Sequence, residues 1–133
     1  YLSKSILDHR LLELVRYRVS QMNNCLYCLD MHFKEAKAAG ETDLRLYSVS
    51  AWREADYYSK KERAVLDFAE RLTLVNKYAT TDQDYDNLAL YFSKDEIADL
   101  TVAVCQINTW NRITDVCRFQ SGKYEIQPKT AAQ

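Results

Sequence analysis

The chain has 133 residues, with 18 Lys and Arg side chains against 19 Asp and Glu side chains and a formal net charge of −1. This length suits a single domain, and so balanced a charge provides little long-range attraction for nucleic acid or an acidic membrane surface. Gly40 and Gly122 are the only glycines, and Pro128 is the only proline. Their scarcity excludes the glycine-rich phosphate loops of Rossmann and Walker proteins and favours an all-α fold.

The residues present exclude further classes of protein. The only two histidines, His9 and His32, do not form the HExxH motif of a zinc helix. The longest segment without a charged side chain, residues 100–111, is too short for a membrane span, which needs about 20 apolar residues. Residues 1–4 contain no apolar core of an export signal, so we expect a cytoplasmic location and no membrane partner.

Hydrophobic spacing predicts two helices in the first third of the chain. Apolar residues recur at three- and four-residue steps over residues 5–22, which indicates one helix. We expect Asn24 to cap the next helix, with Cys25 in its first turn. That helix is predicted to run to about residue 39 and to be closed by Gly40.

Helix-capping motifs place the remaining helices. Residues 43–52 indicate a shorter helical piece, and an aromatic loop over residues 56–58 is expected to pack against the domain. Ser59-Lys-Lys-Glu62 is a capping box that starts a helix ending near residue 76. A short helix follows, capped by Thr81 or Asp82.

A second capping box, Ser93-Lys-Asp-Glu96, starts a long helix that we expect to end at about Cys117. Apolar residues cover most of its circumference, so it is predicted to lie at the centre of the fold or at a subunit interface. Cys105 and Cys117 are expected to be small buried apolar side chains. After Arg118 the sequence is polar and unpatterned, and we expect this tail to fray or to wrap a neighbouring subunit.

A cysteine pair and a histidine share one face of the predicted second helix. At 100° per residue, Cys28 and His32 lie within about 60° of Cys25, whereas Tyr27 and Asp30 point to the opposite side. A thiolate is the reactive form of cysteine, so a redox thiol needs a group that takes its proton. The helix N-terminus favours Cys25 as the more acidic thiol, and a hydrogen bond from His32, one turn later, favours Cys28. The two sulfurs are close enough in sequence to form a disulfide after oxidation of one of them.

Two other interpretations of this pair are a chance pair of inert thiols and a structural zinc site. Zinc would take Glu13 or His9 as its fourth ligand, because the chain has no second Cys-x-x-Cys motif. The shared helical face favours redox chemistry over both. His9 is expected to make a surface contact instead.

The cysteine pair belongs to a longer pattern. Glu13 is followed twelve residues later by Cys25-Leu-Tyr-Cys28 and then by His32. This Glu…Cys-x-x-Cys-x-x-x-His arrangement resembles the signature of alkylhydroperoxidase D-like (AhpD-like) proteins in the carboxymuconolactone decarboxylase superfamily. The resemblance covers roughly residues 5–115 and includes residues 14–21, 28–32, 34–36, 39–42, 46–47, 50–54 and 108–112.

The resemblance implies a single helical AhpD-like domain of about six helices over residues 1–118, followed by a polar tail over residues 119–133. It also implies a homo-oligomer, commonly a trimer or hexamer. Its expected activity is thiol-dependent reduction of alkyl hydroperoxides as an antioxidant enzyme, without a metal, flavin or other cofactor. The expected partners are a small hydroperoxide and an unidentified thiol or lipoyl reductant protein.

Residue roles carry over by position in the motif. By resemblance, Cys28 is the peroxidatic thiol, Cys25 the resolving and more exposed thiol, His32 the proton acceptor and Glu13 the carboxylate that completes the proton relay. Tyr27 departs from the founding member, which has a histidine there, and we expect this to alter rate or partner choice more than mechanism.

Two functions of other classes stay open. The pair would serve as a redox sensor or thiol–disulfide switch in a member without peroxidase activity. A decarboxylase-type activity on a lactone or acid would leave the pair without a role. Trp110-Asn-Arg112 resembles the family's closing segment, expected first to pack or contact another subunit and second to line the pocket.

Overall fold

The structure, a computed structural model, describes residues 2–128, and every regular element among them is helical. The predicted all-α class and the count of about six helices are therefore confirmed. Two 3₁₀ segments, η1 and η2, accompany six α-helices. In chain order the elements are η1 (Leu2–Lys4), α1 (His9–Met22), α2 (Leu26–Ala38), α3 (Asp43–Tyr47), η2 (Val49–Glu54), α4 (Lys60–Thr73), α5 (Asp82–Ala89) and α6 (Lys94–Val116).

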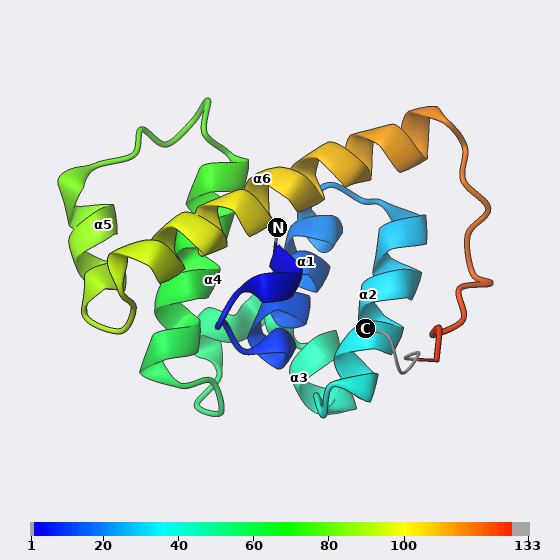
Figure 1. Cartoon of the computed structure of the whole chain (residues 1–133), viewed down its shortest axis with the longest axis horizontal. Coiled ribbons are helices and arrows are strands. Elements are labelled where there is room, and N and C mark those ends of the chain that lie inside the picture. The colour runs from blue at the N-terminus through cyan, green and yellow to red at the C-terminus, as the bar shows by residue number, and fades with distance from the viewer. Residues whose placement is uncertain (1, 129–133) are drawn as a thin grey trace.

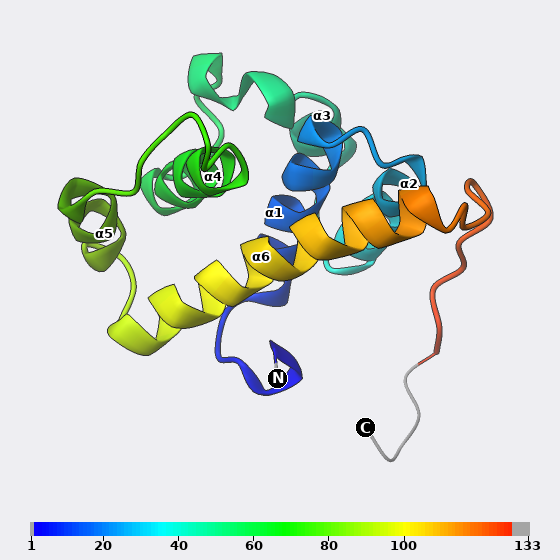
Figure 2. The same cartoon turned by 90° about the horizontal axis from the view of Figure 1, so that it is seen from above.

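The long helix α6 crosses α1, with α4 and α5 toward one of its ends and α2 toward the other (Figure 1). Seen from above, α1 lies under the middle of α6 (Figure 2). Contacts of α1 with α2, α4 and α6 make it the helix around which the others assemble. The C-terminal part of α6 is thereby brought next to the start of α2, where the cysteine pair lies.

Local capping accounts for where several helices begin. The hydroxyls of Ser59 and Ser93 each accept a hydrogen bond from the backbone N–H three residues later, and the backbone N–H of each serine donates to the glutamate carboxylate at that position, so both predicted capping boxes are confirmed. Thr81 forms a third box with Asp84. The helix after Ser59 ends at Thr73, three residues before the predicted end.

Two apolar clusters meet at α1. One joins α1 to α4, α5 and α6 through side chains that include Val15, Phe68 and Leu100, and the other joins α1 to α2, α3 and η2 through Leu14 and Trp52. A buried side chain of this size contributes about 1.5–3 kcal/mol to folding. Because α1 is packed on both sides, polar residues on its buried surface are held in fixed positions.

The segment after α6 folds back on its own chain. Lys34 and Asp30 of α2 hydrogen-bond the backbone of Tyr124, whose hydroxyl bonds the Glu35 carboxylate. The ring of Phe119 packs edge-on against Tyr27 at 5.4 Å. The expectation of a fraying tail is therefore wrong for residues 119–124, because α2 offers charged and aromatic partners. Contact of the tail with a neighbouring subunit stays a prediction, and residues 129–133 lie outside the described part.

Candidate redox site

The turn between α1 and α2 sets the position of the cysteine pair. Asn24 adopts a left-handed conformation with φ 54°, and the N–H of Cys25 bonds the Ser20 carbonyl at 3.1 Å, as in a Schellman helix end. Cys25 is the N-cap of α2, and its Sγ accepts the N–H of Cys28 at 3.3 Å. The prediction that Asn24 caps this helix is therefore wrong, because Asn24 ends the preceding one.

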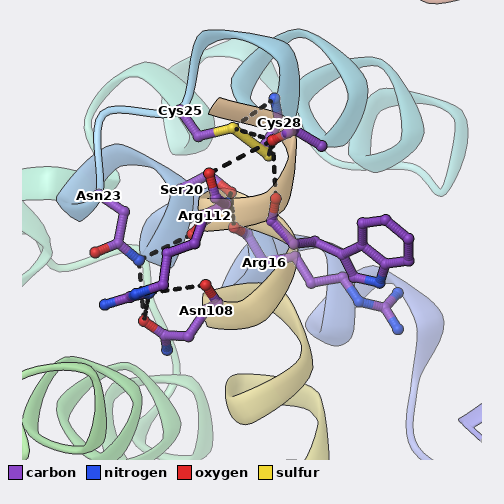
Figure 3. The surroundings of a disulfide bond; sticks show 10 residues. Arg16, Ser20, Asn23, Cys25, Cys28, Asn108 and Arg112 are labelled. Atoms are coloured by element: carbon purple, nitrogen blue, oxygen red, sulfur yellow. Dashed lines mark hydrogen bonds between the residues drawn. A yellow bond between two sulfur atoms is a disulfide. The ribbon is translucent and has the colours of Figure 1, made fainter. Parts of the chain in front are cut away.

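Cys25 and Cys28 form a disulfide, with their Cα atoms 5.3 Å apart, beside the C-terminal part of α6 (Figure 3). Cys25 is 0% exposed and Cys28 is 2% exposed. Cys28 lines a pocket, which Cys25 does not. In this chain the expectation of a more exposed Cys25 is wrong, because the turn after α1 and helix α6 cover its sulfur.

A buried carboxylate and the histidine form the second part of the site. Glu13 of α1 lies 2.7 Å from Nδ1 of His32 through one oxygen and accepts Nη1 of Arg16 at 2.8 Å through the other. Burial alone would raise the pKa of Glu13, but the hydrogen bonds and positive charge of His32 and Arg16 outweigh it and lower that pKa. Glu13 is therefore an anion at neutral pH.

The ionised Glu13 determines which nitrogen of His32 is basic. Since a carboxylate only accepts hydrogen bonds, Nδ1 of His32 donates to Glu13, and in the neutral form of the ring Nε2 is the nitrogen with the lone pair. The structure does not contain the expected hydrogen bond from His32 to the Cys28 sulfur, because Nδ1 of His32 bonds Glu13 instead. His32 and Cys28 are related by the pocket that both of them line. A base and a sulfur thus face a common volume.

The pocket has a volume of about 470 Å³ and opens between α1, α2, α6 and the segment after α6. Tyr27 is part of its wall, so the helical-wheel expectation that Tyr27 points away from the thiols is wrong. It leans toward Phe119, which lies in the returning C-terminal segment. The lining residues are Glu13, Arg16, Tyr27, Cys28, Met31, His32, Gln106, Ile107, Trp110, Thr114 and Phe119.

Among the site residues that the sequence did not indicate, two polar ones contact the predicted groups directly. Thr114 is buried on α6, and its Oγ1 lies 3.1 Å from Sγ of Cys25 and 3.3 Å from Sγ of Cys28. Arg16 of α1 forms an ion pair with Glu13. Spacing from the cysteines does not find Thr114, which lies far along the chain, but Arg16 stands one turn from Glu13 and could have been found as its partner.

The closing segment on α6 has mixed roles. Trp110 lines the pocket, Arg112 is exposed, and Asn111 is fully buried, where it donates a hydrogen bond to Ser20 and accepts one from Asn23. The first expected role, packing, fits Asn111, and the second, pocket lining, fits Trp110. Contacts with another subunit stay a prediction.

Other candidates lie outside the site. His9 is exposed, as expected for a surface residue. Cys105 on α6 and Cys117, the C-cap of α6, are exposed free thiols, so the expectation of buried side chains is wrong. Among residues 2–128, no three or more His, Cys, Asp or Glu side chains are grouped to hold a metal ion. No helix in that part of the chain is long and apolar enough to span a membrane.

Comparison with known proteins agrees with this fold. The uncharacterized protein YdfG of Bacillus subtilis (strain 168) is 39% identical over 114 residues, which cover 86% of this chain and 78% of YdfG. A protein of unknown function from Agrobacterium tumefaciens, whose name relates it to the antioxidant defence protein AhpD, has a TM-score of 0.87 and 36% identity, covering 93% of this chain and 85% of its own.

A more distant structure shows the fold alone. The alkylhydroperoxidase AhpD core of an uncharacterized peroxidase-related protein from Ralstonia eutropha JMP134 has a TM-score of 0.75 at 22% identity, covering 85% of this chain and 60% of its own. The carboxymuconolactone decarboxylase family matches residues 1–71, a stretch that contains the cysteine pair, the histidine and the buried carboxylate. The AhpD-like fold and this match over more than half of the sequence place the chain in the carboxymuconolactone decarboxylase family.

Proposed function

We propose that the protein is a thiol-dependent peroxidase that reduces organic hydroperoxides through Cys28 and Cys25. The observation that carries this proposal is the shared pocket, into which the buried Cys28 and a histidine bonded to an ionised carboxylate both face. A nucleophilic sulfur next to a poised base is what peroxide reduction requires. The relation of the Agrobacterium neighbour's name to AhpD supports the same activity.

The reaction begins with the reduced pair. Nε2 of His32 takes the proton of the Cys28 thiol, and Glu13 stabilises the imidazolium that results. The Cys28 thiolate attacks the distal oxygen of the hydroperoxide, so an S–O bond forms as the O–O bond breaks. The alkoxide takes the proton held by His32 and leaves as the alcohol, and sulfur is oxidised by two electrons to a sulfenic acid.

Cys25 completes the turnover. Its thiolate attacks the sulfenic sulfur of Cys28, the disulfide forms, and hydroxide leaves as water after it takes the proton that Cys25 lost. The disulfide between these residues is the product of that step. A dithiol reductant, protein-bound thiol or lipoyl, must supply two electrons and two protons to restore both thiols.

The pocket suits an organic peroxide better than hydrogen peroxide. Its volume of about 470 Å³ falls in the ordinary range for small-molecule sites. Ile107, Trp110 and Phe119 supply apolar wall for an alkyl or aryl group, whereas Glu13 and His32 lie at its polar part. A substrate with an apolar body and one peroxide group matches this division.

A stopped-flow experiment tests the proposal. Cumene hydroperoxide is mixed with reduced protein in which Cys105 and Cys117 are replaced by Ser, so that exposed thiols do not contribute. We expect loss of both remaining thiols at the rate of peroxide consumption. Cys28→Ser should abolish consumption, and Cys25→Ser should stop at a sulfenic acid that a dimedone-type probe captures.

The outcomes separate the alternatives. Retention of both thiols in the presence of peroxide would overturn the peroxidase and favour a thiol–disulfide switch driven by another disulfide. A decarboxylase-type reaction would leave the thiol count unchanged and would survive Cys28→Ser. The pocket next to Cys28 favours the peroxidase, because a switch that exchanges only with proteins needs no internal volume.

We also propose that the protein works as a homo-oligomer, a trimer or hexamer. Helix α6 exposes Val102, Ile113 and Val116, apolar side chains that another subunit would cover. Analytical ultracentrifugation of the full chain gives the subunit count directly. If the protein were a monomer at micromolar concentration and had full peroxidase activity, the proposal that it works as an oligomer would be contradicted.

A further inference from the structure

We propose that the Thr114 hydroxyl is a hydrogen-bond donor to the thiolates of the reduced pair and that it makes the pair more acidic and more easily reduced. The inference deepens the proposed function, since it concerns the same two cysteines. It depends only on a reversible pair and not on the identity of the oxidant. The disulfide shows that the two sulfurs lie within bonding distance of each other and can form one redox pair.

The position of Thr114 is the first observation. Its side chain is 4% exposed, and its Oγ1 lies 3.1 Å from Sγ of Cys25 and 3.3 Å from Sγ of Cys28. These distances are within hydrogen-bond range for sulfur. One hydroxyl therefore serves whichever of the two sulfurs carries the charge.

The second observation is a competing acceptor. Oγ1 of Thr114 also lies 2.8 Å from the Trp110 carbonyl, one turn earlier on α6. A hydroxyl has one proton to donate, and a disulfide sulfur is a weak acceptor, so in the oxidised protein the proton goes to that carbonyl. A thiolate is a charged acceptor and forms a stronger bond, so reduction turns the proton toward sulfur.

A polar network holds the hydroxyl in place. Asn111, fully buried on α6, donates to Oγ of Ser20 at 3.1 Å and accepts from Asn23 at 2.9 Å. The Ser20 carbonyl in turn accepts the N–H of Cys25. Asn23 also bonds Asn108, as Figure 3 shows. Helix α6 is thus tied to the residues that precede the pair, which fixes the hydroxyl relative to both sulfurs.

Other groups around the pair act separately from Thr114. The ionisable side chains that share the pocket with Cys28 are Glu13 and Arg16 of α1 and Tyr27 and His32 of α2. The hydrogen bonds of Thr114 go to backbone and sulfur atoms and to none of these four. Removing the hydroxyl therefore leaves the charges of the relay in place.

The same helix offers a matched control. Thr101 bonds the Ile97 carbonyl one turn earlier at 2.8 Å, the same local bond that Thr114 makes to Trp110, and it makes no hydrogen bond to Cys25 or Cys28. A Thr→Val change at either position removes one hydroxyl from α6 and keeps the β-branched shape of the side chain. Only the change at Thr114 alters the surroundings of the pair.

The test compares Thr114→Val, Thr114→Ala, Thr114→Ser and Thr101→Val in the background in which Cys105 and Cys117 are replaced by Ser. The thiolate is titrated by its ultraviolet absorbance in the reduced protein, and the disulfide is equilibrated with dithiothreitol buffers. In Thr114→Val and Thr114→Ala we expect the lower thiol pKa to rise by about 1 unit, a tenfold effect. The reduction potential should become more negative by up to about 30 mV, the conversion of a tenfold change for two electrons.

Thr114→Ser should return both values toward wild type, and Thr101→Val should leave them unchanged. The proposal is overturned if a folded Thr114→Val or Thr114→Ala protein titrates and equilibrates as wild type does. It is also overturned if Thr101→Val gives the same shifts, because loss of the helical hydroxyl bond would then suffice. No peroxide enters either measurement, so failure of the peroxidase proposal and failure of this one are distinguishable.

Discussion

Two buried carboxylates, Glu13 and Glu70, look alike in charge and burial and differ in what surrounds them. Glu13 lies beside His32 and Arg16 and borders the pocket. Glu70 on α4 accepts hydrogen bonds from Arg18, Trp52 and Arg53 and does not line the pocket next to Cys28. Burial favours a raised pKa for both, yet the donors around each outweigh it and lower the pKa.

The difference is in the partners. Arginine and the tryptophan indole keep their protons at any ordinary pH, so the bonds of Glu70 stabilise the fold without moving a proton. The imidazole of His32 has two ring nitrogens, so one can bond Glu13 while the other exchanges a proton with a reacting atom. A buried anion alone therefore does not identify a catalytic carboxylate. A neighbour that can exchange a proton, together with access to a pocket, does.

The largest expected effect is on activity at Glu13. Glu13→Gln keeps the size of the side chain but removes the anion that fixes the proton on Nδ1 of His32. We expect the rate constant for cumene hydroperoxide reduction to fall about 100-fold or more, the usual contribution of general acid–base catalysis. Stopped-flow kinetics of the reduced variant measure it, and a rate close to wild type would remove Glu13 from the relay.

Glu70→Gln should act on stability instead. Arg18, Arg53 and Trp52 would lose a charged acceptor, and we expect the free energy of unfolding to fall by about 2 kcal/mol, less than for a fully buried pair because Arg53 is half exposed. Urea denaturation measures this.

A matched variant tests whether the burial of Glu70 is the reason for this loss of stability. Asp67→Asn removes the exposed partner of Arg53, 2.8 Å away, and should change stability by less than about 0.5 kcal/mol. Equal losses of unfolding free energy in Glu70→Gln and Asp67→Asn would contradict the idea that the buried ion pairs stabilise the fold more than the exposed one. The folded fraction of Glu70→Gln should still reduce peroxide at the wild-type rate, unlike Glu13→Gln.

Acid should weaken the fold through both carboxylates. Their pKa values are lowered from the ordinary 4.5, so on acidification the unfolded chain takes up protons before the folded chain does. Their contribution to stability is complete above about pH 5.5 and is lost as the pH falls through the lowered folded-state pKa values. We expect wild type to lose about 1 kcal/mol more than Glu70→Gln between about pH 6 and pH 4. Urea titrations across that range test it; parallel curves would show that Glu70 is not a source of acid sensitivity.

Much of the fold and site could be predicted from sequence because the signals are local. The capping boxes at Ser59 and Ser93 involve residues three apart, and the shared face of Cys28 and His32 follows from helical periodicity. The family match adds Glu13, whose contact with His32 crosses two helices. Each of these features lies within one helix or between two consecutive helices.

The features that were missed depend on how distant segments meet. Thr114 reaches the sulfurs only because α6 crosses α1 at one particular place, and nothing in the residues around it signals that contact. Tyr27 turns toward the pocket because the chain after α6 returns along α2 and offers Phe119 as a partner. The left-handed turn at Asn24 moves the cap of α2 to Cys25, a shift of one residue that capping preferences alone do not resolve.

The smallest expected effect concerns the wall of the pocket that Glu13 lines and Glu70 does not. Phe119 is 43% exposed, is held by its N–H bond to the Thr114 carbonyl at 3.0 Å and packs on Tyr27. Phe119→Ala should raise KM for cumene hydroperoxide about threefold, the value of one aromatic contact, and leave the rate with hydrogen peroxide unchanged. Tyr78→Ala, which removes a similarly exposed ring that lines no part of this pocket, should change neither value. If Phe119→Ala slows both peroxides equally, the ring acts on the sulfur's surroundings rather than on the substrate's apolar body, and the pocket next to Glu13 selects peroxides by its polar residues alone.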